Sequence, residues 1–282
     1  MACHVCPASF MNKHFDSFRK FEHDGWERVA DKYEAVWSSL TKRFVVPLLD
    51  AVKVGPGMNI LDVACGPGYV ASAAAQRGAT ATGLDFSSRM VHQARKLYPA
   101  IRFVEGDAEK LPFAGNSFER IVINFGVLHL AHPQKAFAEG HRVLRDNGLI
   151  GFTVWAEPEK NPGAKIVEDA ITAHADTSVN LPEGPPYFLF CDKGACAQVL
   201  GQAGFSAATH QTVTVEWTLP DENYLFEAER HAGVRTAALL SLQSQERLAA
   251  IKKAIARGVA SYKTRGGYAV PMAAHVITAK AI

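Results

Sequence analysis

A glycine turn between a short apolar run and an alanine-rich segment is the feature of this sequence whose residue types and spacing point most directly to chemistry. Residues 60–63 are mostly apolar and predict a buried strand, which is followed by Gly66 and Gly68. Residues 70–76 are rich in alanine and predict a helix. Glycine lets a backbone approach a ligand closely, and the first N–H groups of a helix lack partners within it. This order of elements predicts a nucleotide-cofactor site.

The turn alone fits two classes of cofactor. Gly66, Gly68 and Ala71 satisfy the relaxed dinucleotide pattern G-x-G-x-x-A, and Asp85 follows at the distance at which such domains place an acidic residue. An NAD(P)-dependent Rossmann oxidoreductase is therefore one interpretation of this motif.

The composition is that of a globular protein with one large core. The chain has 282 residues, 48% of them hydrophobic and 21% charged, enough for one α/β core and a cap or small subdomain. The formal net charge is only +2, and lysine and arginine are scattered along the chain. We expect no nucleic-acid partner, because phosphate backbones are bound by clustered positive charge.

Cysteine usage and targeting signals bear on the compartment. Five irregularly spaced cysteines are typical of reduced thiols in an intracellular protein. Cys3 and Cys6, with His4 between them, have no second pair at zinc-ligand spacing, so we expect no metal site. Residues 1–10 do not resemble a secretory signal, and no apolar run reaches the roughly 20 residues of a membrane span. These features predict a cytoplasmic protein.

Strands and helices alternate through the middle of the chain, which predicts parallel β-α-β crossovers and a doubly wound α/β sheet. The predicted strands are 59–63, 80–84, 101–105, 118–124, 149–155, 206–217 and 270–279. The predicted helices between them are 70–76, 88–97, 134–144 and 192–203, with a turn at 146–148 before the fifth strand.

Other segments break this rhythm and predict additions to the core. Five prolines around one helical patch predict a loop-rich lid. A long, almost wholly helical stretch before the last strand predicts a cap. The predicted division is an N-terminal helical segment over the cofactor site (1–55), the Rossmann-like core (56–156), the lid (157–190), a continuation of the core (191–217), the helical cap (218–268) and the C-terminal core strand (269–282).

Several short motifs occur in a fixed order. They are LDVACGPG at 61–68, GLDFSSRM at 83–90, GDAEKLPF at 106–113, NSFE at 116–119 with LH at 128–129, and VLRDNG at 143–148. The series resembles class I S-adenosylmethionine-dependent methyltransferases, most closely the group of the ubiquinone- and menaquinone-biosynthesis enzymes and many small-molecule relatives. The resemblance implies a seven-stranded sheet with an antiparallel last strand. One departure is Tyr69, which stands where the family motif has a third glycine.

The resemblance also implies which residues bind S-adenosylmethionine and its product S-adenosylhomocysteine. Asp62 would orient the ammonium group, Asp85 would accept from the ribose hydroxyls, and Asp107 would accept from the adenine amino group. Phe86 and Met90 would enclose the adenine. The full set is Tyr33, Asp62, Ala64, Gly66, Gly68, Asp85, Phe86, Met90, Gly106, Asp107, Ala108, Asn124 and Gly126.

The catalytic candidate is His129, which follows the fourth strand at the rim where the acceptor should lie. Methyl transfer from a sulfonium is an in-line displacement that needs a base only if the acceptor must lose a proton. Imidazole takes a proton near neutral pH, although a histidine here could instead bond a lid backbone group. His231, Tyr187 and Tyr268 are further candidates from the cap.

Aromatic residues are plentiful in the lid and the cap and favour an apolar or planar acceptor. We expect a small organic acceptor methylated on oxygen or carbon, and a monomer or homodimer. An oxidoreductase leaves the turn at 106–108 unexplained. A nucleic-acid amine methyltransferase would carry an Asn/Asp-Pro-Pro-aromatic segment where this chain has residues 124–127. A non-catalytic S-adenosylmethionine-binding partner protein is a third alternative.

Overall fold

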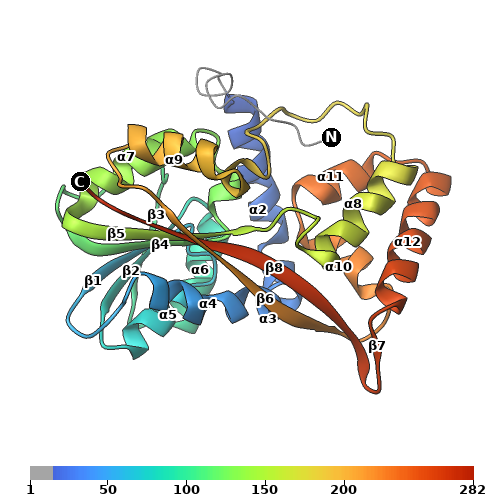
Figure 1. Ribbon diagram of the computed structural model, residues 1–282, viewed down its shortest axis with the longest axis horizontal. Coiled ribbons are helices and arrows are strands. Elements are labelled where there is room, and N and C mark those ends of the chain that lie inside the picture. The colour runs from blue at the N-terminus through green and yellow to red at the C-terminus, as the bar shows by residue number, and fades with distance from the viewer. Residues whose placement is uncertain (1–14) are drawn as a thin grey trace.

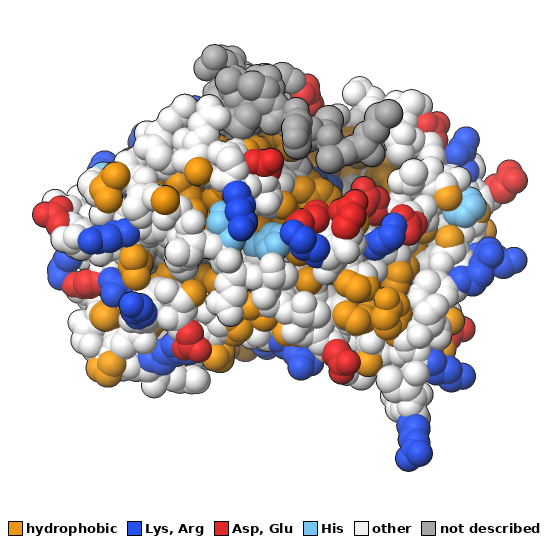
Figure 2. Space-filling model, viewed as in Figure 1, with side chains coloured by type: hydrophobic (Ala, Val, Ile, Leu, Met, Phe, Trp, Pro, Cys, Tyr) orange, Lys and Arg blue, Asp and Glu red, His pale blue; other side chains and the backbone are white. Residues whose placement is uncertain are grey.

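The computed structural model describes residues 15–282, so Cys3, Cys6 and the start of the predicted N-terminal segment lie outside the described residues. A twisted sheet with helices on both faces fills one half of the molecule and a layer of helices the other, with α2 (Asp16–Val36) between them (Figure 1). None of the helices in the described part combines the length and hydropathy that crossing a membrane requires. On the face seen in Figure 2, positive and negative side chains are interspersed.

The strands form one sheet in the order β3-β2-β1-β4-β5-β8-β6, and the short β7 pairs with β8. Strands β1 to β5 are parallel, whereas β8 runs antiparallel to both β5 and β6. The predicted doubly wound sheet with an antiparallel last strand is therefore confirmed. The strands are β1 (Asn59–Val63), β2 (Thr80–Asp85), β3 (Arg102–Glu105), β4 (Phe118–Asn124), β5 (Leu144–Trp155), β6 (Thr209–Leu219), β7 (Lys263–Thr264) and β8 (Gly267–Lys280).

Helices cover both faces of the sheet because successive strand residues alternate between two apolar cores. Leu61 faces the core under α7 and α9, whereas Ile60 faces the core under α4, α5 and α6. Ser87 caps α6, and its side chain accepts from the Met90 N–H at 3.2 Å. The remaining helical elements are α3 (Ser38–Thr41), η1 (Lys42–Phe44), α4 (Val45–Ala51), α5 (Tyr69–Gln76), α6 (Ser88–Leu97), η2 (Val127–His129), α7 (Pro133–Val143), α8 (Pro162–His174), η3 (Leu189–Cys191), α9 (Lys193–Gln202), α10 (Tyr224–Ala232), α11 (Arg235–Ser241) and α12 (Gln245–Ala260).

The helical layer is supported by a strand ribbon that leaves the sheet. Strand β8 pairs with β5 only from Ala274 onward, but it pairs with β6 along nearly its whole length. The first half of β8 therefore extends beyond the sheet. There, Trp217 and Val270 of the ribbon join α8, α10, α11 and α12 in a separate apolar core. The layer thus joins the predicted lid helix to the predicted cap helices, since α8 packs on α12.

The start of the fifth strand differs from the prediction. Residues 146–148 were expected to form a turn before a strand at 149, but β5 begins at Leu144, directly after α7. Leu144 pairs with Phe118 and Leu149 with Arg120, so β5 bulges between these pairs, and Asn147 has φ of 63°. Asn147 thus adopts a left-handed conformation within the bulge, while residues on both sides of it stay paired to β4.

Two glycines of the β1–α5 turn provide a test of packing behind the site. Gly68 has φ of 86°, and a Cβ there would lie 2.6 Å from the buried Phe103 ring, whereas Gly66 has φ of 50° and no atom within 4 Å of its Cβ position. We expect Gly68→Ala to lower the free energy of unfolding by about 2–4 kcal/mol, from backbone strain plus overpacking. Gly66→Ala should lower it by only about 1 kcal/mol, from backbone strain alone. Urea denaturation of the two ligand-free variants measures both, and equal losses would contradict the packing role of Gly68.

Candidate functional site

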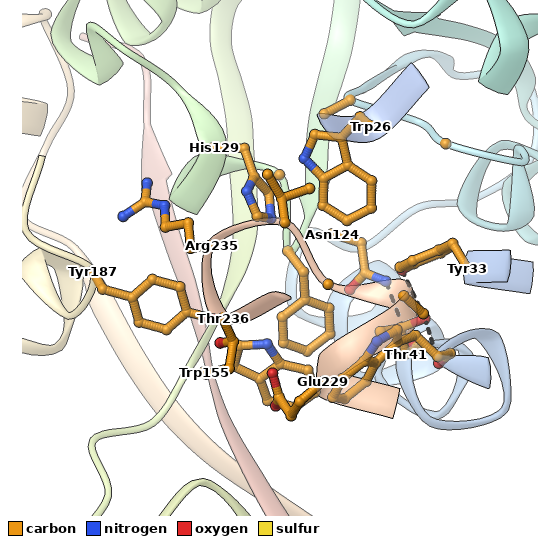
Figure 3. A pocket seen from close by; sticks show the side chains of 18 of the residues that line it. Trp26, Tyr33, Thr41, Asn124, His129, Trp155, Tyr187, Glu229, Arg235 and Thr236 are labelled. Carbon is orange, nitrogen blue, oxygen red and sulfur yellow. Dashed lines mark hydrogen bonds between the residues drawn. The ribbon is translucent and has the colours of Figure 1, made fainter. Parts of the chain in front are cut away.

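A cavity of about 500 Å³ lies where the carboxyl ends of β1, β2 and β4 face α2 and the helical layer (Figure 3). Open α/β sheets bind ligands at this edge, and cavities of this size suit small molecules. Most of the residues predicted from the sequence line it. They are Tyr33, Asp62, Ala64, Gly66, Asp85, Phe86, Met90, Asn124, Gly126 and His129.

Four predicted residues do not line this cavity. Gly68 packs behind the turn against Phe103, and Ala108 is buried in the core under α7. Asp107 pairs with Arg19 of α2, which also pairs with Glu109. Gly106 lies in the same turn, with Leu84 3.0 Å from the position of an added Cβ. The 106–108 turn therefore holds α2 through ion pairs at this end of the cavity.

Asp62 is a fully buried carboxyl whose hydrogen bonding is incomplete. Its Oδ2 accepts from the Ala71 N–H in the first turn of α5 at 2.9 Å, and its Oδ1 has no partner among the described residues. Burial raises the pKa of Asp62 to about 8. A cation donating to Oδ1 would remove this penalty, because buried charges are stable when paired.

Asp85 ends β2 and links the two neighbouring turns. Its Oδ2 accepts from the Gly66 N–H at 2.8 Å, and its Oδ1 accepts from the Ser87 N–H at 2.9 Å. Burial raises the pKa of Asp85 to about 6 despite these two bonds. Each carboxylate oxygen keeps a free lone pair, so Asp85 can accept from a hydroxyl pair of a ligand in the cavity.

The turn after β4 forms the wall beside Ala64. Phe125 has φ of 58°, and its N–H donates to the Thr153 hydroxyl, which donates to Asn124 Oδ1 at 2.7 Å. A Cβ on Gly126 would lie 2.5 Å from the Ala64 Cβ, so these two turns touch. The glycine at 126 is required because no larger residue fits there.

Aromatic and thioether groups line the side of the cavity nearest α2 and α6. Phe86 and the buried Met90 face it, and the His23 ring meets Phe86 edge-on with centroids 5.4 Å apart. The Tyr33 hydroxyl donates to Thr41 Oγ1 at 3.1 Å, and burial raises the pKa of Tyr33. Trp26 packs edge-on against Tyr33, and its indole N–H has no partner among residues 15–282.

His129 is oriented by a buried carboxylate. Its Nδ1 lies 2.9 Å from Glu22 Oε2, and Glu22 is fully buried. Since a carboxylate only accepts, Nδ1 carries the proton when the imidazole is neutral, and Nε2 is left as an acceptor. Arg235 Nε donates to the other Glu22 oxygen at 2.7 Å, and Arg235 also donates to the Leu128 carbonyl. Burial opposes ionisation of Glu22, but His129 and Arg235 outweigh it and lower its pKa.

The sequence analysis missed both Glu22 and Arg235. A usable signal exists for Glu22, because it shares the buried face of α2 with Phe18, Gly25 and Val29. A charged residue in the middle of an apolar helix stripe requires a partner. Arg235 is 213 residues away from Glu22 along the chain, and no local pattern connects the two.

The remaining cap candidates for a base are placed differently. Neither His231 nor Tyr268 lines the cavity. His231 is exposed and pairs with Glu227, whereas the Tyr268 hydroxyl donates to Glu222. Tyr187 does line it, and burial raises the pKa of its hydroxyl.

A group of potential metal ligands lies elsewhere, in Glu157, Cys191 and His275. Their polar atoms already bond to one another or to neighbours. Glu157 Oε2 lies 2.8 Å from His275 Nε2, and the Cys191 thiol donates to the Trp155 carbonyl at 3.2 Å. Burial raises the pKa of Cys191 to about 12, so the thiol keeps its proton. We assign this group a structural role.

Comparison with known proteins places the motif region in a family. Residues 61–152 match the model described as Methyltransferase domain. The demethylmenaquinone methyltransferase of Renibacterium salmoninarum is 31% identical over 201 residues, which are 67% of this chain and 85% of that protein.

Solved structures share the fold at low identity. A SAM-dependent methyltransferase of Thermotoga maritima has a TM-score of 0.55 at 17% identity, covering 92% of this chain and 99% of its own. The phosphoethanolamine N-methyltransferase 2 of Haemonchus contortus, solved with phosphomonomethylethanolamine and S-adenosylhomocysteine, has a TM-score of 0.55 at 16% identity, covering 94% of this chain and 60% of its own.

The raised pKa of Asp62 gives a pH dependence of stability. In the folded, ligand-free protein Asp62 keeps a proton that the unfolded chain loses above about pH 4. The free energy of unfolding should therefore fall as the pH rises from 5 to 7, by roughly 1.4 kcal/mol per pH unit from this group. Asp62→Asn should remove the contribution of this group and make the fall shallower by roughly 1.4 kcal/mol per pH unit.

Urea denaturation at several pH values measures this slope. Asp85, whose pKa is about 6, adds to the fall only in the lower part of the window, and Glu229, whose pKa is about 7, adds to it over most of the window. Glu22 and Glu157 have lowered pKa values and stay ionised throughout, so they add no slope. A stability that is constant or rises with pH in the wild type contradicts a protonated Asp62.

Proposed function

This chain belongs to the class I S-adenosylmethionine-dependent methyltransferases of the menaquinone and ubiquinone type, and from that premise we propose that it methylates oxygen or carbon of a small organic acceptor in the cavity under its helical layer. The single observation that carries the proposal is the unpartnered Oδ1 of the buried Asp62 beside the Gly66 turn.

The residues present fit S-adenosylmethionine. Asp62 Oδ1 can accept from an ammonium group, and Asp85 can accept from ribose hydroxyls. The open space at Gly66 admits a ligand against the backbone, and Phe86 and Met90 offer apolar faces for a base. When bound, this cofactor supplies a methyl group that positive sulfur has already activated.

The same carboxylate disfavours a dinucleotide. The N-terminus of α5, where a pyrophosphate would bind, already donates its Ala71 N–H to Asp62. A pyrophosphate placed there would meet a buried acidic group instead of free donors. The nicotinamide alternative therefore lacks its anion site in this turn.

His129 is proposed as the base for an acceptor that must lose a proton. Its Nε2 is the free ring nitrogen, since Nδ1 is bonded to Glu22. Glu22 stabilises the imidazolium that forms when Nε2 takes a proton, and Arg235 holds the Glu22 carboxylate in place. The apolar walls from the lid and the cap exclude water around this step.

We propose that the helical layer acts as the cap of the site. Lid residues 157–190 and cap residues 218–268 both contribute to the cavity lining, and Trp26, Tyr33 and Trp37 of the N-terminal segment also contribute to it. This supports the division predicted from the sequence.

The proposal is tested by cofactor binding and by transfer. Calorimetry should detect binding of S-adenosylhomocysteine and not of NADH, and labelled methyl from S-adenosylmethionine should appear in the small-molecule fraction of a crude extract. Binding of NADH alone, or label only in RNA or protein, would contradict the proposal.

Binding of S-adenosylhomocysteine should also release protons. An ammonium group beside Asp62 lowers its pKa from about 8, so close to one proton should leave at pH 7. Calorimetry in buffers of different ionisation enthalpy measures this number. Asp62→Asn should bind about 10- to 100-fold more weakly and release no proton from this site. The same proton release in the wild type and the variant would count against the assignment.

Substitutions of the His129 pair should separate chemistry from binding. We expect His129→Asn to lower kcat by roughly 10²- to 10⁴-fold and Glu22→Gln by a smaller factor, both with little change in S-adenosylhomocysteine affinity. His231→Gln is the matched control, because His231 also pairs with a glutamate but does not line the cavity. An undiminished kcat in His129→Asn would exclude it as the base.

A further inference from the structure

Glu229 of α10 is an acidic residue of the cavity that the cofactor and the base leave unused. It lines the cavity, and Figure 3 shows its side chain on the side opposite His129. Its Oε2 lies 3.7 Å from the Cβ position of Gly233, which belongs to the same wall. The Thr236 side chain also lines the cavity and lowers the pKa of this carboxyl, although burial outweighs it.

This carboxyl has no cationic partner among residues 15–282. Arg230 follows Glu229 directly but is exposed, and Arg235 uses its guanidinium on Glu22 and the Leu128 carbonyl. Burial raises the pKa of Glu229 to about 7. By contrast, Glu227 on the same helix does not line the cavity and has a cationic partner, Lys252, at 2.7 Å. A cavity-facing carboxyl with one neutral partner can accept a further hydrogen bond at little cost.

Many other residues that line the cavity are apolar, and several of them are aromatic. The Trp155 ring stacks on Phe125 with centroids 4.1 Å apart, and the Trp37 ring stacks on Trp217 with centroids 5.0 Å apart. Tyr187, Phe188, Leu225 and Met272 complete the lining on this side. Stacked indoles have few alternative rotamers, so they present fixed faces to a planar ligand.

We infer that the methyl acceptor is a flat, apolar molecule that carries a hydroxyl or amino group at the end away from the methylated atom, and that Glu229 and Thr236 bind this donor. The inference rests on the proposed function and names the acceptor class of the same cavity. The methylated end then faces His129, and the donor at the other end faces Glu229 on the opposite side of the cavity.

Three probes test this with the full-length protein saturated with S-adenosylhomocysteine. They are 2-naphthol, with one hydroxyl, 2,6-dihydroxynaphthalene, with a second hydroxyl, and 6-(aminomethyl)-2-naphthol, with a protonated amine. At least one two-ended probe should bind about tenfold or more tightly than 2-naphthol, because 2-naphthol cannot make the hydrogen bond to the Glu229 carboxyl. In Glu229→Leu this ratio should fall to near one.

Further variants identify the donor and control for folding. Glu229→Gln should keep the preference for the diol if the donor is a hydroxyl, and lose the preference for the amine if the donor is a cation. Glu227→Gln, on the same helix, should leave all three dissociation constants unchanged. Equal binding of the three probes to the wild type, no binding of either two-ended probe, or a preference that persists in Glu229→Leu overturns the inference. Loss of S-adenosylhomocysteine binding in the wild type would instead overturn the proposed function.

Discussion

The buried carboxylate of Glu22 is the interaction on which the closed cavity depends. It joins α2, the η2 turn and α11, three elements that are remote in sequence, through His129 at 2.9 Å and Arg235 at 2.7 Å. Removing one partner of a buried ion pair typically costs about 3–5 kcal/mol, because the other charge stays buried. Arg235 also lies over the Phe18 ring at 4.4 Å, so the contact is packed as well as charged. The helical layer is thereby fixed to the sheet at the point where His129 needs one orientation.

Three other carboxyls that line the cavity differ from Glu22 in their hydrogen-bond partners and in the direction of their pKa shifts. Glu22 has a partner for each oxygen and a lowered pKa, whereas Asp62, Asp85 and Glu229 have raised pKa values and incomplete partners. A folded protein tolerates such groups where a ligand completes them, since perturbed acids in a cleft gather at functional sites. The paired carboxylate holds three elements of the cavity together, and the other three are the carboxyls that we propose to bind ligand groups.

The sequence predicts the parts of this site that depend on local order. Asp62, Gly66 and Asp85 lie at the ends of strands, where the chain direction of a parallel sheet brings them to one edge. The same pattern could not distinguish Gly66, which faces the cavity, from Gly68, which packs on Phe103, because both need a left-handed backbone. It also could not predict that α2 reaches the 106–108 turn or that Arg235 reaches Glu22. Those contacts depend on the placement of the helical layer, which the β6–β8 ribbon determines over a long range.

Similarity to known proteins covers one side of the cavity and not the other. The family match covers residues 61–152, which include the cavity-lining residues from Asp62 to Gly126, the side proposed to bind the cofactor, and also His129. The side proposed to bind the acceptor comes from α8, α10, α11 and the first half of β8, all outside that match. The helical layer and the sheet have distinct apolar cores. The residues that the helical layer contributes to the cavity can therefore change while the strands and turns of the sheet keep their geometry. The acceptor is therefore to be identified from Glu229, Thr236 and the stacked indoles of this chain, more than from the substrates of proteins that share its cofactor side.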